Sequence, residues 1–178
     1  FVAYCGVQPM VVTLGGSFLF TGVALLVSNL SATESYKGIS GFPDSFLQIS
    51  KFKLFGVIPC QVIIFLVLAV IAYVLLNKTK YGRMVFLIGV NKDAAEFSGI
   101  NTRLITMTTY ILSGISAAIA GIILTSYIGT AKSDIGVTFT LPIITAVVLG
   151  GTLSTGGKGS VVGTALAAVG IGVLKFGL

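Results

Sequence analysis

The part of the chain that looks most like a site for chemistry is the glycine-rich run 150–160 around Lys158. A phosphate-binding loop would hold a nucleotide with its backbone N–H groups, and its motif is Gly, four residues, Gly-Lys and then Ser or Thr. Here the first position of that motif is Thr152, and the residue after Lys158 is Gly159. Both ends of the motif fail, so we do not expect this run to bind a nucleotide.

The glycines of this run still require a physical reason, because glycine is costly inside a helix and permissive where the chain bends. We expect a tight bend between two apolar segments. The bend is either a simple packed hairpin or a broken helix that lines a cavity, which membrane proteins tolerate where the backbone is buried in protein. The candidate hinge residues are Gly150, Gly151, Gly156 and Gly157.

The other side chains offer little to an enzyme. The chain has no His and only five acidic residues, which excludes a His-based catalytic triad, a His-ligated metal and a His-ligated haem. The sequence shows no nucleophile–base pair and no cluster of metal ligands. We therefore expect a protein that is not an enzyme and needs no cofactor.

A second candidate site lies in a polar segment in the middle of the chain. Asn91 is placed to cap a short helix, Asp93 falls in its first turn, where the helix dipole favours an acid, and Gly99 is placed to end it. We expect a short polar helix over about 92–98, with two adjacent alanines small enough to seat in a groove of another protein. An ordinary capped loop helix is the alternative.

The composition of the chain indicates that these segments belong to a membrane protein. Of the 178 residues, 55% are hydrophobic and only 9% are charged, whereas a soluble domain carries about 25% charged residues. The charged residues, which give a net charge of +6, are scattered between apolar runs. We therefore expect this protein to lie in a lipid membrane and to bind no nucleic acid. A helix crosses the hydrocarbon core with about 20 apolar residues. The predicted segments are 10–30, 57–77, 104–127, 137–153 and 160–178.

The fold class that we predict is all-α, a polytopic transmembrane helical bundle of about five membrane segments. The last two are short or broken by glycine, and Pro142 with the paired glycines interrupts the segment 137–153. The chain starts at Phe1 without a Met, so we expect 1–178 to be part of one transmembrane domain in a longer protein.

Basic residues orient the bundle. The loop 78–103 holds five Lys and Arg residues and the loop 31–56 holds three, and cytoplasmic loops carry the excess of basic residues. We therefore expect 78–103 in the cytoplasm and 31–56 in the periplasm, with 46–55 along the membrane surface. Small residues also recur every four positions, which favours close helix packing or, alternatively, a face that lines a conduit. These residues are Ser113, Ala117 and Gly121, and then Gly159, Gly163 and Ala167.

Four stretches, in order and at the expected spacing, resemble the permease subunits of ribose-type ABC importers in the branched-chain/ribose superfamily. The stretches are 81–83, 88–100, 146–151 and 156–164. Within the family, 36–43, 126–136 and 142–148 are most similar to the branch that imports autoinducer-2. Leu141-Pro142-Ile143 replaces the acidic residue and the Asp-Ala that are usual in ribose permeases.

This resemblance implies a permease subunit that translocates a small, polar, sugar-like ligand, with autoinducer-2 favoured, across the bacterial inner membrane. A second permease subunit would complete the pathway, cytoplasmic ATPase subunits would supply the energy, and a periplasmic ligand-binding protein would deliver the ligand. The permease would do no covalent chemistry, because a partner hydrolyses the ATP.

The resemblance also implies roles for residues. The short helix would dock in a groove of the ATPase and rock the membrane helices when the ATPases close. Its coupling residues are Asn91, Lys92, Asp93, Ala94, Ala95, Glu96 and Gly99. Besides the hinge glycines, the pathway candidates are Thr125, Ser126, Asp134 and Thr145. Lys132, Asp134 and the loop 31–56 would meet the binding protein.

Three other functions stay open. A permease for ribose or another monosaccharide is the alternative within the family. An ion-coupled secondary transporter is the alternative of another class, but it usually needs an ionisable residue within the membrane, and the first three predicted spans contain none. A membrane-anchored enzyme is the third, for which no catalytic group is visible.

Overall fold

The computed structural model describes residues 2–30, 39–51, 53–54 and 58–177. Across these ranges the regular structure is helical apart from β1 and β2, two strands of two residues that pair antiparallel. The elements in chain order are α1 (Val2–Cys5), α2 (Pro9–Leu30), α3 (Asp44–Lys51), β1 (Lys53–Leu54), β2 (Ile58–Pro59), α4 (Cys60–Lys78), α5 (Lys80–Val90), α6 (Lys92–Phe97), α7 (Thr102–Ile128), α8 (Val137–Leu149) and α9 (Val161–Gly177).

The helices α2, α4 and α7 are long and apolar enough to cross a membrane. Each begins and ends within three residues of a predicted span. The helices α8 and α9 are apolar but shorter, as we expected of the last two segments. The prediction of an all-α, polytopic helical fold is confirmed.

The prediction that Pro142 interrupts the segment 137–153 was wrong. Pro142 lies inside α8, which continues to Leu149. Proline lacks a backbone N–H, so at this sixth helical position it removes one hydrogen bond and leaves the remaining ones in place. The paired glycines end the helix instead, and Gly151 adopts a φ of +88° there.

The contacts divide the chain into two compact units. The first comprises Phe1–Ile64 with Thr109–Val137. In this unit the end of α7 holds the helix α3, because Ser126 Oγ donates a hydrogen bond of 2.7 Å to the carbonyl of Phe46. Ile39 and Ala131 form an antiparallel bridge beside it, with N–O distances of 2.9 and 3.0 Å.

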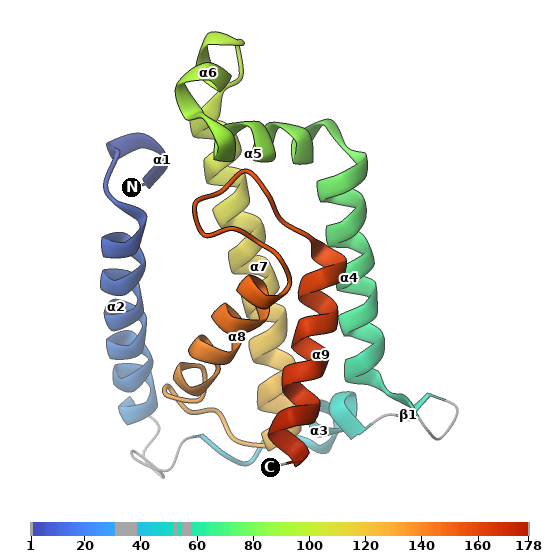
Figure 1. Ribbon diagram of the computed structural model, residues 1–178. Coiled ribbons are helices and arrows are strands. Elements are labelled where there is room, and N and C mark those ends of the chain that lie inside the picture. The colour runs from blue at the N-terminus through green and yellow to red at the C-terminus, as the bar shows by residue number, and fades with distance from the viewer. Residues whose placement is uncertain (1, 31–38, 52, 55–57, 178) are drawn as a thin grey trace. The chain divides into compact units, whose positions relative to one another are not determined.

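The second unit comprises Phe65–Thr108 with Thr138–Leu178. Here α5 turns sharply off the end of α4 (Figure 1). Thr79 caps α5 by accepting a hydrogen bond of 3.3 Å from the Gly82 N–H. A Cβ at Gly82 would overlap the backbone carbonyl of Leu76, so this corner requires glycine.

The helices α8 and α9 of the second unit touch at both ends. Near the connecting loop, a Cβ at Gly163 would overlap the carbonyl of Gly150. Near the other end, Lys175 Nζ lies 5.1 Å from the centre of the Phe139 ring, which suits a cation–π contact. Gly163 thus uses its small size for close packing, whereas an added Cβ at Gly121 in α7 would meet nothing within 4 Å.

Candidate functional site

The short helix predicted in the segment 78–103 exists as α6. Asn91 caps its start, and its side-chain oxygen accepts a hydrogen bond of 3.0 Å from the Ala94 N–H. Asp93 lies in the first turn, as predicted. Such a cap satisfies a backbone donor that would otherwise lack a partner in the helix.

Gly99 ends α6 in the way that the sequence predicts. Its φ is +79°, a left-handed conformation that costs glycine least. The Gly99 N–H donates to the Glu96 carbonyl at 2.9 Å, and the Ile100 N–H donates to the Ala95 carbonyl at 3.1 Å. These two bonds complete a Schellman motif, so both ends of the helix are closed.

A side-chain hydrogen bond ties the end of α6 to the start of α7. Thr102 Oγ1 donates to a carboxylate oxygen of Glu96, and Thr102 is only 2% exposed. Asn101 then caps α7 by accepting from the Leu104 N–H at 3.1 Å. Glu96 therefore has a partner within its own chain, while Lys92 and Asp93 are exposed at the other end of the helix.

The two alanines of α6 differ in exposure, which the sequence did not indicate. Ala95 is 4% exposed and packs inside the second unit, whereas Ala94 is exposed. The expectation that both alanines seat in a partner's groove was therefore wrong for Ala95. The most exposed large apolar side chain of the helix is Phe97, at 93%, and our reading of the sequence missed it.

Replacing Asn91 with alanine should weaken α6 without unfolding the protein. Loss of an N-cap costs about 1 kcal/mol, which corresponds to roughly fivefold faster opening of the local backbone. Hydrogen–deuterium exchange of residues 92–98 in the full-length permease measures this. Asn91→Asp keeps a side-chain acceptor and should exchange like the wild type. Equal exchange of the alanine and aspartate variants would contradict the capping role.

The glycine-rich loop between α8 and α9 is closed by its own hydrogen bonds. The Gly151 N–H donates to the Val148 carbonyl at 3.0 Å and the Thr152 N–H to the Val147 carbonyl at 3.2 Å, which is a second Schellman motif. The loop then turns back on itself, because the Leu153 N–H donates to the Lys158 carbonyl at 3.0 Å. It is an ordered turn with glycines at three left-handed positions, Gly151, Gly156 and Gly157.

The pathway candidates fall into both units. Thr125, Ser126 and Asp134 belong to the first, and Ser126 is 2% exposed with its hydroxyl bonded to the Phe46 carbonyl. The structure therefore gives Ser126 a packing role. Thr145 belongs to the second unit, where its hydroxyl donates to the Leu141 carbonyl within α8 at 2.9 Å. Part of the loop 31–56 predicted to meet the binding protein lies outside the described residues.

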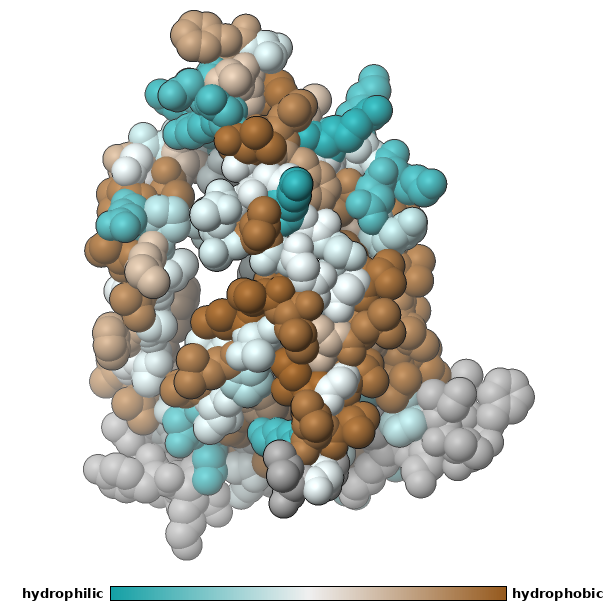
Figure 2. Space-filling view, viewed as in Figure 1, coloured by the Kyte–Doolittle hydropathy of each residue, from teal (hydrophilic) through white to brown (hydrophobic). Residues whose placement is uncertain are grey.

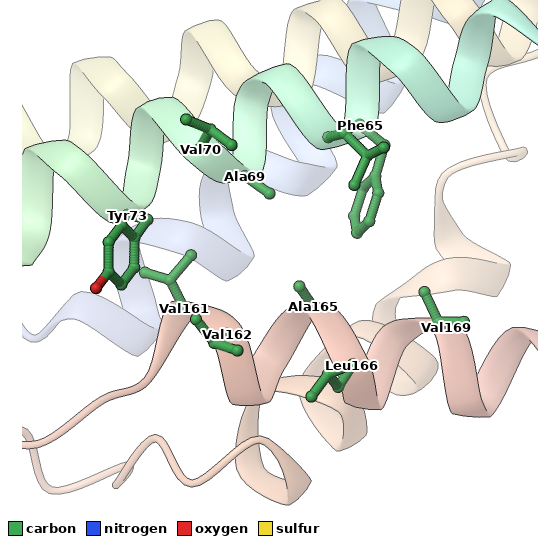
Figure 3. Close-up of a pocket in the computed structure, with 10 residues that line it drawn as sticks. Phe65, Ala69, Val70, Tyr73, Val161, Val162, Ala165, Leu166 and Val169 are labelled. Atoms are coloured by element: carbon green, nitrogen blue, oxygen red, sulfur yellow. The ribbon is translucent and has the colours of Figure 1, made fainter.

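A groove between α4 and α9 is lined almost entirely by apolar side chains, with Tyr73 as the residue that carries a hydroxyl. Its volume is about 320 Å³. Ala69 and Tyr73 of α4 face Val161 and Ala165 of α9 across it (Figure 3). Figure 2 shows hydrophobic surface over α4 and α9 and hydrophilic surface around α5 and α6. This contrast fits a membrane-spanning α4 that leads into a polar segment outside the hydrocarbon core.

Comparison with known proteins gives a consistent result. Residues 1–178 match the family described as "Branched-chain amino acid transport system / permease component". The proteins named autoinducer 2 import system permease protein LsrD from Yersinia enterocolitica, Salmonella typhimurium and Yersinia pseudotuberculosis are each 44% identical over 99% of this chain. The alignment covers 53% of each relative, so the chain spans about half of their length. No solved structure matches the chain at a significant level.

Proposed function

Because the chain belongs to the branched-chain amino acid transport system / permease component family, we propose that it is part of a permease subunit of an ABC importer. The part of the chain that the structure describes contains three helices long enough to span a membrane, and together with the family this makes it a multi-pass protein of the inner membrane. The translocated ligand is a small, polar, sugar-like molecule, and autoinducer-2 is favoured. The observation that carries this choice is the 44% identity over 99% of the chain to permeases named for autoinducer 2 import.

The helix α6 is the part that receives the energy of ATP hydrolysis in this proposal. Its exposed residues Lys92, Asp93 and Ala94 lie next to a cap that holds the start of the helix. The ends of α6 are fixed by hydrogen bonds, so a push on it moves the start of α7 as well. Docking in a groove of a cytoplasmic ATPase turns closure of the ATPase pair into movement of the membrane helices.

The apolar Phe97 is the anchor that we add to this docking surface. A side chain that is 93% exposed stays in water unless a partner covers it. Aromatic side chains supply most of the binding energy where they enter a pocket, while surrounding charges set orientation. Lys92 and Asp93 are the charged residues that set the orientation of docking here, since the Glu96 carboxylate is already bonded to Thr102.

On the opposite side of the membrane, the end of α7 and the helix α3 form the surface for a periplasmic binding protein. Ser126 fixes α3 through the Phe46 carbonyl. Lys132 and Asp134 follow α7 and are the only charged residues in the sequence between Arg103 and Lys158. A second permease subunit completes the pathway. Thr125 in the first unit, and Thr145 and the backbone at Gly150 in the second, are the candidates that each unit offers for its polar lining.

The ligand is tested with the complete transporter in liposomes, with permease, ATPase and binding protein present. Autoinducer-2 should stimulate ATP hydrolysis and enter the liposomes only when ATP is supplied, and ribose should do neither. Stimulation by ribose or another monosaccharide alone would reassign the ligand within the family. Uptake that follows an ion gradient and ignores ATP would favour a secondary transporter and overturn the proposal.

The docking helix is tested by two neighbouring cysteine substitutions. In membranes that hold the complete transporter, Ala94→Cys should crosslink to the ATPase, and the yield should change when ATP is added. Ala95→Cys is the matched control, because that position is 4% exposed and the probe cannot reach a partner. Absence of a crosslink from Ala94, with the ATPase bound, would remove α6 from the interface.

A further inference from the structure

The last turn of α5 lies directly against the glycine-rich loop. A Cβ at Gly89 would stand 2.5 Å from the Gly157 backbone nitrogen, closer than real Cβ atoms approach other atoms. A Cβ at Gly156 would in turn stand 2.8 Å from the Gly89 carbonyl oxygen, and one at Gly157 would stand 2.7 Å from Val90 Cγ2. The contact therefore exists because glycine occupies both sides of it. Figure 1 shows the loop between α8 and α9 running up to α5.

One side of this contact continues into α6. The Asn91 N–H donates to the Leu87 carbonyl of α5 at 3.1 Å, and the Asn91 side chain caps α6. The same residue thus closes the end of α5 and the start of α6. A displacement of α6 must pull on the turn that carries Gly89.

The other side of the contact continues into α8 and α9. The loop is closed by hydrogen bonds at its start and across its turn. The two helices that it joins touch at Gly150 and Gly163 and again at Lys175 and Phe139. Closely packed segments of this kind move together, because packed interiors transmit strain instead of absorbing it.

We propose that Gly89, Gly156 and Gly157 form a transmission contact that carries the movement of α6 to the helices α8 and α9. Gly89 is a positioning residue, and the loop glycines serve close contact more than hinge bending. The inference rests on the proposed function, in which α6 receives a push from an ATPase. It adds the route by which this push reaches the membrane helices in the second half of the chain.

The first test is Gly89→Ala in the complete transporter. The added methyl group forces the loop away from α5, and the amount of ligand taken up per ATP should therefore fall about tenfold, a typical size for coupling between sites. The rate of ATP hydrolysis should stay within about twofold of the wild-type rate, because the substitution lies outside the ATPase subunits. The matched control is Gly170→Ala in α9, where a Cβ would meet nothing within 4 Å. This control should transport like the wild type. Normal uptake per ATP in an assembled Gly89→Ala transporter would overturn the proposal.

A second variant tests the contact even if Gly89→Ala does not assemble. Val90→Ala removes Cγ2, the atom of Val90 that lies nearest to the Cβ position of Gly157. This variant loosens the contact and adds no atom to it, so ATP hydrolysis should stay within about twofold of the wild type while ligand taken up per ATP falls about fivefold, at the low end of coupling between sites. Normal uptake per ATP in the assembled Val90→Ala transporter would overturn the proposal.

These experiments separate the two levels of inference. If the wild-type transporter shows no ATP-driven uptake, the proposed function fails, whatever the glycine variants do. If the wild type is coupled and Gly89→Ala is equally coupled, the proposed function stands and the transmission contact fails. The deciding quantity is the amount of ligand taken up per ATP hydrolysed. A purely structural defect lowers ligand uptake and ATP hydrolysis together and leaves this ratio unchanged.

Discussion

Replacing Gly82 with alanine is expected to destabilise the full-length permease by about 1–3 kcal/mol, the usual range for overpacking. Gly82 is buried at the start of α5, and an added Cβ would overlap the Leu76 carbonyl at the end of α4. Neither neighbour can give way easily, because both are backbone in a helix or its first turn. The free energy of unfolding in mixed detergent micelles measures the effect.

The matched control for this variant is Gly114→Ala in α7. A Cβ there would meet nothing within 4 Å, and alanine favours an exposed helix over glycine by about 1 kcal/mol. Both substitutions add the same methyl group. If Gly82→Ala lowers the free energy of unfolding and Gly114→Ala raises it, the difference is the steric cost at the corner between α4 and α5. A Gly82→Ala protein as stable as the wild type would mean that the α4–α5 corner is wider than described.

Replacing Phe97 with alanine is expected to weaken binding of the ATPase by about 2 kcal/mol, or roughly thirtyfold in the dissociation constant. The side chain is 93% exposed within the chain, so its truncation removes little internal packing. The free energy of unfolding should therefore change by no more than about 0.5 kcal/mol. Titration of the detergent-solubilised permease with the ATPase measures the affinity.

Two further variants show whether this effect belongs to docking. Phe97→Leu keeps an apolar side chain and should recover part of the lost affinity. Phe18→Ala truncates the same residue type at a position in α2 that is 77% exposed, and a residue in a membrane span should not alter ATPase binding. Unchanged affinity of Phe97→Ala, with α6 intact by hydrogen exchange, would remove Phe97 from the proposed interface.

Features that depend on neighbours in the chain could be predicted from the sequence. The apolar spans are continuous runs, so their positions follow from the length that a membrane requires. The helix α6 is defined by Asn91 at its start and Gly99 at its end, and both act on backbone groups within a few residues. The orientation of the segment 78–103 and its role in coupling remain predictions.

Features that depend on distant residues could not be predicted in this way. The helix α5 contains Gly82 and Gly89, which disfavour a helix when they are considered alone. The structure supplies their reason, since Gly82 meets Leu76 and Gly89 meets Gly157. Ser126 looked like a polar residue for a pathway, but its hydroxyl is bonded to a carbonyl 80 residues away in the chain.

By itself the sequence determined that this protein is helical, that it spans the membrane several times, and that a short helix lies between the cap Asn91 and the terminating Gly99. Hydrophobic run length and helix capping are local, and they act whatever the rest of the chain does. Only the tertiary structure decided that Ala95 is buried while Ala94 and Phe97 are exposed, and that glycines in α5 and the 150–160 loop touch. Those outcomes depend on which surfaces come together in space, and no local pattern of residues encodes them.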